Sequence, residues 1–154
     1  MALVDEGMKR QMAGDLDDSI RLYKESISIC PTADAHTYLG WAYSFRGRID
    51  DAIAQCEIAI QLDPEFGNPY NDIGVYLIEL GKEDEAIPYL EKAMRARRYC
   101  CYQFAHFNLG RIYLKKKMYE QARQKFKEAL KIDPDYLPAS EGLELLKALG
   151  FTDT

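Results

Sequence analysis

The feature of this sequence that most constrains its fold is a pattern that returns every 34 to 36 residues. It reads YLGWAYSFRGRIDDAIAQCEIAI, then YNDIGVYLIELGKEDEAIPYLEKA, then HFNLGRIYLKKKMYEQARQKFKEA. Aligning these stretches, with a looser stretch before them, divides most of the chain into units 1–32, 33–66, 67–102 and 103–136. A period of this length is typical of a solenoid, in which a unit buries its apolar faces only against its neighbours.

Each unit has the pattern of two helices. In unit 33–66, apolar residues recur at helical spacing up to Phe45 and again from Ile49 to Ile60. Pro64 then ends the second run, because proline cannot continue a helix and disfavours helical geometry at Asp63. No convincing strand is present, so the sequence predicts an all-α chain.

Small residues recur at fixed positions of the units. Glycine in the middle of a helix costs about 0.5–1 kcal/mol relative to alanine, so its repetition indicates a close approach of the two helices. The mid-helix glycines are Gly40, Gly74 and Gly110, and the alanines expected to face them are Ala52, Ala86 and Ala122.

A second set of glycines ends the first helix of its unit, where a left-handed residue is common. These glycines are Gly14, Gly47 and Gly81. Unit 103–136 has Lys117 at this position, so we expect its turn to be tighter or strained.

These features resemble those of the tetratricopeptide repeat family. In unit 103–136 the positions that match the family's pattern are Leu109, Gly110, Tyr113, Ala122, Phe126, Ala129 and Pro134. His36 and His106 stand where the family often has tryptophan, which favours a packing role over a metal-binding or catalytic one.

The resemblance implies one domain, residues 1–154, built as a right-handed superhelical solenoid of antiparallel helix pairs. First helices would line the concave face and second helices the convex face. Residues 137–149 fit a C-terminal capping helix that docks through Ala139, Leu143 and Leu146, while Leu145 and Leu149 widen its apolar face.

In that geometry the first helices form a groove rich in aromatic side chains. The residues predicted to bind a partner there are Met8, Met12, Tyr38, Trp41, Phe45, Asn71, Val75, Ile78, Phe104, Phe107, Asn108 and Arg111. Trp41 is the expected anchor, because binding energy concentrates in buried tryptophan, tyrosine and arginine. The alternative is that several of these aromatic side chains pack between neighbouring inner helices. We predict a groove for an apolar helix or extended peptide.

The clamp with which co-chaperones of this family hold acidic tails is not expected here. It uses lysines, asparagines and an arginine, whereas the matching positions hold Val4, Met8, Tyr38, Asn68 and Asp72. None of these residues is basic, and Asp72 would repel a carboxylate.

The charge is divided unevenly along the chain. Residues 92–131 hold 12 Lys/Arg and 2 Asp/Glu, whereas residues 1–91 hold 7 basic and 18 acidic residues. A basic rim is expected at Arg95, Arg97, Arg98 and Lys115. Four interpretations of these basic residues are open. They form a solvated face, they bind an acidic segment of a partner, they meet the acidic half of a second copy in a head-to-tail oligomer, or they bind nucleic acid. The overall acidity counts against nucleic acid.

The sequence offers little for catalysis or cofactors. It has no phosphate-binding glycine loop, no Cys-x-x-Cys, and no nucleophile with an arguable histidine partner. No apolar run is long enough to span a membrane, and the opening residues lack the pattern of a secretory signal. We therefore expect a cytoplasmic, non-enzymatic adaptor or chaperone-like scaffold that binds a protein or peptide, without a cofactor or metal. Self-association is the runner-up.

Overall fold

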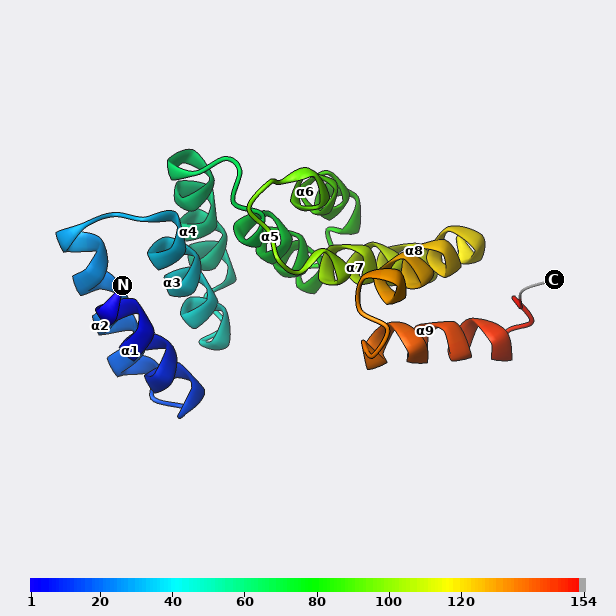
Figure 1. Ribbon diagram of the computed structural model, residues 1–154, viewed down its shortest axis with the longest axis horizontal. Helices are drawn as coiled ribbons and strands as arrows, with labels where there is room; N and C mark the ends of the chain where they lie inside the picture. The colour runs from blue at the N-terminus through cyan, green and yellow to red at the C-terminus, as the bar shows by residue number, and fades with distance from the viewer. Residues whose placement is uncertain (153–154) are drawn as a thin grey trace.

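The computed structural model describes residues 1–152, which form nine α-helices and no strand (Figure 1). The helices are α1 Ala2–Met12, α2 Leu16–Ile29, α3 Ala33–Phe45, α4 Ile49–Leu62, α5 Asn68–Glu79, α6 Glu83–Arg95, α7 Tyr102–Lys115, α8 Tyr119–Ile132 and α9 Leu137–Ala148. The prediction of an all-α helical repeat is confirmed. Two helices begin with a side-chain cap: Asp15 accepts a hydrogen bond from the Asp18 N–H, and Thr32 accepts one from the Ala35 N–H.

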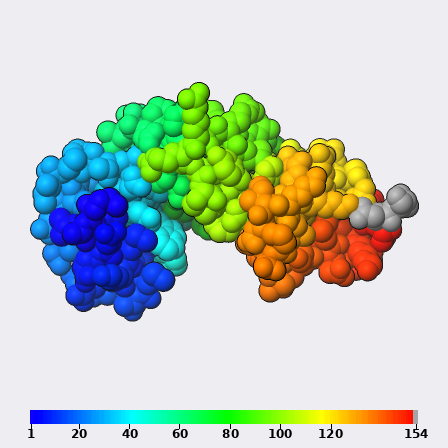
Figure 2. Space-filling view, viewed as in Figure 1, coloured from blue at the N-terminus to red at the C-terminus, as the bar shows by residue number. Residues whose placement is uncertain are grey.

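The helices stack in pairs along a curved solenoid. Each helix packs on the next one in the chain, and the first helices α1, α3, α5 and α7 also contact one another in succession. Within residues 1–152 the second helices α2, α4, α6 and α8 make no such contacts with one another. The first helices are therefore crowded on the inside of the curve, and the second helices fan out on the outside. Figure 2 shows the resulting arch, hollowed between its N-terminal end and α9.

Two of the three mid-helix glycines face a large side chain of the paired helix and not the predicted alanine. A Cβ atom at Gly74 would lie 2.5 Å from Cδ2 of Leu90, and one at Gly110 would lie 2.5 Å from Cε1 of Phe126. At these two positions the prediction was wrong by one helical turn, because Leu90 and Phe126 stand four residues after the predicted alanines. At Gly40 the predicted Ala52 is the nearest neighbour, through its carbonyl oxygen, followed by Sγ of Cys56.

The turns inside the helix pairs adopt the expected left-handed conformation. Gly14, Gly47 and Gly81 have φ angles of 85°, 73° and 73°. Lys117 takes the same position with φ 60°, and it is the only residue other than glycine with a positive φ between residues 1 and 152. The prediction of a strained turn is therefore confirmed at Lys117, because a Cβ atom disfavours this region.

Helix α9 closes the C-terminal end of the stack. Ala139 and Leu146 are fully buried and pack with Phe126 of α8, and Leu143 joins them at the edge. Leu145 of the same helix and Leu149, which directly follows it, remain exposed. No helix in the described part of the chain combines the length and apolar character needed to cross a membrane.

Candidate functional site: an aromatic pocket between inner helices

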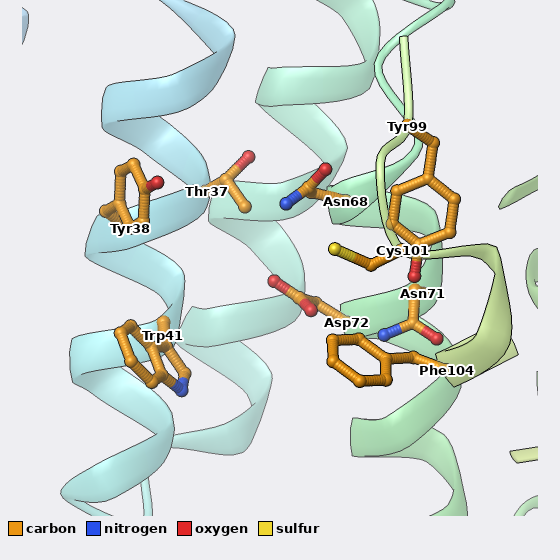
Figure 3. A pocket seen from close by; sticks show the side chains of 9 residues that line it. All are labelled: Thr37, Tyr38, Trp41, Asn68, Asn71, Asp72, Tyr99, Cys101 and Phe104. Atoms are coloured by element: carbon orange, nitrogen blue, oxygen red, sulfur yellow. The ribbon is translucent and has the colours of Figure 1, made fainter. Parts of the chain in front are cut away.

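A pocket of about 260 Å³ opens between α3, α5 and the start of α7 (Figure 3). It is lined by Thr37, Tyr38 and Trp41 from α3, by Asn68, Asn71 and Asp72 from α5, and by Tyr99, Cys101 and Phe104 from the α6–α7 segment. Because α3, α5 and α7 belong to the inner row of helices, the pocket lies in the groove that the sequence predicts.

Backbone pairing between two linkers builds one side of the pocket. The Gly67 N–H donates to the Arg98 carbonyl at 3.0 Å, and the Arg98 N–H donates to the Glu65 carbonyl at 2.8 Å. These bonds form an isolated parallel bridge between the α4–α5 and α6–α7 linkers. They hold Tyr99 directly on Gly67, where an added Cβ atom would lie 2.5 Å from Cγ of the tyrosine.

The Arg98 side chain ties the same linker to two preceding elements. Its guanidinium lies 2.8 Å from an Asp63 carboxylate oxygen and 3.3 Å from Asp34 at the start of α3. It also lies 3.8 Å from the centre of the Phe66 ring. Arg98 therefore stabilises the edge of the pocket, and its positive charge balances the negative charge of Asp34.

Large aromatic side chains form the walls. Trp41 on α3 is 37% exposed and Phe104 on α7 is 38% exposed. Trp41 meets Phe45 edge-on at 5.4 Å between ring centres, and Phe104 packs against Tyr136 at 5.4 Å. Tyr38 is less available, since it stacks on Tyr23 of α2 at 6.0 Å.

Asp72 is the acidic group of the pocket. In Figure 3 its carboxylate points from α5 toward the space between Trp41 and Phe104. Burial raises its pKa to about 7, although a hydrogen bond with Asn71 acts in the opposite direction. No Lys, Arg or His among residues 1–152 forms an ion pair with Asp72.

Two further polar side chains of the pocket stay neutral near pH 7. The Tyr99 hydroxyl is buried without a hydrogen-bond partner, and burial raises the pKa of this phenol. Burial and a hydrogen bond with Cys100 raise the pKa of the Cys101 thiol to about 11. No cluster of three or more His, Cys, Asp or Glu side chains suited to a metal occurs in the described residues.

The predicted groove residues divide into several groups in the structure. Tyr38, Trp41, Asn71 and Phe104 line the pocket. Ile78 and Arg111 instead line a second hollow of about 440 Å³, together with Lys115.

Other predicted groove residues hold the inner helices together. Asn71 and Asn108 are buried, and Asn108 donates a hydrogen bond of 3.1 Å to Asn71 across α5 and α7. Phe107 packs on Phe126 and Tyr136 near α9. Met8 packs on the core, in line with the alternative that inner side chains fill the spaces between helices.

Like Met8, Phe107 and Asn108, the last three predicted groove residues lie outside both hollows. Met12 is exposed at the end of α1, and Phe45 is exposed at the end of α3. Val75 is half-buried on α5.

The four residues of the predicted basic rim all lie beside carboxylates of the same chain. Arg95 lies 3.7 Å from Glu91, and Arg97 lies 3.6 Å from Glu65. Arg98 pairs with Asp34 and Asp63 as described above, and Lys115 pairs with Glu83. Their charge is therefore partly balanced within the chain.

The predicted binding residues omit Thr37, Asn68 and Asp72 of the pocket. Sequence reasoning also missed Tyr99 and Cys101 as pocket residues. Both lie in the α6–α7 linker, at the end of the one unit that is 36 residues long. The extra length, with Arg98 where the family usually has proline, was the available signal. It indicated an irregular linker but not the direction in which the linker folds.

Comparisons with known proteins agree with this architecture. Two sequence-family models, both described as "Tetratricopeptide repeat", match residues 33–66 and 103–136 and residues 68–100. The crystal structure of PilW, described as a widely conserved type IV pilus biogenesis factor, superposes with a TM-score of 0.87 at 21% identity. That superposition covers 96% of this chain and 68% of PilW.

Two curated relatives are much longer than this chain. The "Small glutamine-rich tetratricopeptide repeat-containing protein 2" of Mycosarcoma maydis is 30% identical over 90 residues, which are 58% of this chain and 26% of the relative. The "Tetratricopeptide repeat protein 21B" of Mus musculus is 27% identical over 115 residues, 75% of this chain and 8% of that protein. The family-model matches cover about two thirds of the 154 residues. The chain therefore belongs to the tetratricopeptide repeat family.

Proposed function

We propose that this chain is a non-enzymatic protein-binding module that holds an apolar peptide or helix of a partner in its concave groove. The observation that carries the proposal is the pocket on the inner row of helices, where Trp41 and Phe104 each leave more than a third of their surface open. Solenoids use such concave surfaces for binding.

The chemistry of the pocket favours recognition over catalysis. Its walls are aromatic, and polar side chains such as Asn68 and Asp72 stand between them, an arrangement typical of sites that bind by burial and by a few oriented polar groups. Large aromatic side chains such as Trp41 often dominate binding energy at the centre of an interface. The family membership supports the same role, as an adaptor or scaffold.

Self-association through the acidic and basic halves has weaker support. It requires basic side chains that are free to meet a second molecule. Arg95, Arg97, Arg98 and Lys115 instead pair with carboxylates of their own chain. The concave groove is therefore the preferred binding surface.

A peptide selection tests the proposed function. Random 12-residue peptides displayed on phage would be selected on the intact chain, and enriched peptides synthesised with a fluorescent label. Their affinity would be measured by fluorescence anisotropy for the wild type, Trp41→Ala and Phe104→Ala. We expect at least a tenfold loss for both variants, because each removes an aromatic wall of the pocket.

The matched control is Ile58→Ala on the outer helix α4. Ile58 is 37% exposed, as Trp41 is, but it lies outside the pocket. Its substitution should leave affinity unchanged. Enriched peptides that bind Trp41→Ala and Phe104→Ala as tightly as the wild type, with both variants folded by circular dichroism, would contradict the proposed function.

A further inference from the structure

We propose that the pocket between Trp41, Asp72 and Phe104 accepts an arginine side chain of the bound peptide. The proposal rests on the proposed function, since it names one residue of the segment that the groove holds. It adds a charged anchor to an otherwise apolar mode of binding.

The pocket holds an acidic side chain that no cation of the described chain matches. Two acidic side chains stand near the pocket on adjacent inner helices, Asp34 on α3 and Asp72 on α5. Arg98 pairs with Asp34, whereas no basic side chain of residues 1–152 pairs with Asp72. Asp72 has a hydrogen bond with Asn71 but, within those residues, no cation beside it. A half-buried carboxylate without an ion-pair partner is costly, and a cation that enters the pocket would relieve this cost.

The electrostatic field around the pocket is negative. The pKa of the Tyr38 phenol is raised first by burial and then by the charges of Asp34, Asp5 and Asp72. These three carboxylates belong to α1, α3 and α5. Arg98 balances the charge of Asp34, so Asp5 and Asp72 are the carboxylates that make the inner face near the pocket negative. A negative concave surface attracts a positively charged segment and repels an acidic one.

The shape and chemistry of the pocket suit a guanidinium group. Aromatic rings attract guanidinium groups to their faces, and Trp41 and Phe104 present such surfaces on opposite sides of Asp72 (Figure 3). Asn68 adds an amide oxygen at the same pocket. A planar group with five N–H donors can donate to a carboxylate and to an amide oxygen at the same time.

Arginine is preferred to lysine for that reason. A lysine ammonium is a compact charge with three donors and no flat face to lie on a ring. The volume of about 260 Å³ is suited to one side chain and not to a helix, so the rest of the peptide would lie along the groove outside.

Trp41 provides a direct readout, because it is the only tryptophan of the chain and lines the pocket. Three capped peptides, Ala-Leu-X-Leu-Ala with X as arginine, citrulline or methionine, would be titrated into the intact protein while tryptophan emission is recorded. Citrulline keeps the shape of arginine but carries no charge. We expect saturable binding of the arginine peptide and at least tenfold weaker binding of the other two.

Asp72→Asn tests the role of the carboxylate without changing its size. It should weaken binding of the arginine peptide at least tenfold and leave the citrulline peptide within about twofold of its wild-type affinity. Glu57→Gln on the outer helix α4 is the control, because it removes the same charge from an exposed position away from the pocket. It should leave both affinities unchanged.

The outcomes separate this proposal from the proposed function. Equal binding of the arginine and citrulline peptides, or no effect of Asp72→Asn, would overturn the arginine site. So would the absence of any emission change with the arginine peptide at millimolar concentration. If the phage-selected peptides still require Trp41 and Phe104 in that case, the groove remains the binding surface and only its charged anchor is refuted.

Discussion

The ring of Phe126 on α8 lies directly against Gly110 on α7, where an added Cβ atom would come within 2.5 Å of Cε1. Gly142 of α9 touches the other edge of the same ring, since a Cβ atom there would lie 2.7 Å from Cε2. The ring therefore has no free side to which it could move. One phenylalanine joins the last helix pair to the capping helix.

Gly110→Ala should therefore destabilise the protein, although alanine is the better helix former. The gain in helix propensity is about 1 kcal/mol, while overpacking of a filled core costs about 1–3 kcal/mol. We expect a net loss of up to about 2 kcal/mol in the free energy of unfolding, measured by urea denaturation followed by circular dichroism.

A double-mutant cycle checks the cause of this loss. In a Phe126→Leu background the ring edge is absent, so Gly110→Ala should cost much less or become stabilising. Strictly additive effects of the two substitutions would show that the glycine is not needed for the ring.

Lys117→Gly should stabilise the chain. Lys117 has φ 60° at a position where three other units have glycine, and a left-handed residue with a Cβ atom costs about 1 kcal/mol. We expect the free energy of unfolding to rise by about 0.5–1 kcal/mol, detected as a higher midpoint of urea denaturation.

The reverse change at the equivalent turn is the control. Gly81 has φ 73°, and a Cβ atom added there would meet no other atom within 4 Å. Gly81→Ala therefore introduces backbone strain without a steric clash. It should lower stability by about 1 kcal/mol. A neutral result at both positions would mean that these turns tolerate any residue.

Much of this architecture was predictable because its determinants are local and repeated. Pro64, Gly47 and the apolar spacing around them act within one turn or one helix. The contacts between paired helices were harder to predict, because they depend on the axial shift of one helix along the other. That shift placed Leu90 and Phe126, and not Ala86 and Ala122, against the mid-helix glycines.

The pocket was predictable only in part. Trp41 and Phe104 follow from the helical pattern, since their positions on α3 and α7 repeat from unit to unit. Tyr99 enters the pocket through the backbone bonds between Arg98 and the α4–α5 linker, 31 and 33 residues earlier at Gly67 and Glu65. No periodicity encodes such a non-local bridge.

Gly67→Ala should disturb that bridge. The new Cβ atom would lie 2.5 Å from Cγ of Tyr99, close to the backbone, where the side chain cannot swing away. We expect a loss of about 1–3 kcal/mol in stability. The Arg98 and Gly67 amides should also exchange hydrogen faster, as measured by NMR.

Asn68→Ala is the matched control, because it changes the next residue without adding an atom toward the linker. In Asn68→Ala, the Arg98 amide should exchange hydrogen at the same rate as in the wild type. Unchanged exchange in Gly67→Ala as well would show that Tyr99 does not depend on close approach to this glycine.

Asp72 should make stability depend on pH in an unusual direction for a carboxylate. Its pKa rises from 3.8 to about 7 on folding, so the folded state favours the protonated acid. Asp72 therefore contributes at most about 4 kcal/mol to the free energy of unfolding. This contribution is fully present below about pH 4 and is lost as pH rises through about 7. The titratable groups that interact electrostatically with Asp72 are Tyr38, Cys56, Tyr76 and Tyr99. The pKa of each is raised, so all four stay neutral in this pH range.

Asp72→Asn removes this titration and should stabilise the chain at pH 8 more than at pH 4. We expect the difference in unfolding free energy between variant and wild type to grow by about 1–4 kcal/mol over that interval, measured by urea denaturation at each pH. Glu57→Gln, which changes an exposed carboxylate on α4, should show a flat difference. A flat difference for Asp72→Asn too would mean that its carboxylate is ionised and well solvated at pH 4. The cost that a bound cation would relieve would then be absent.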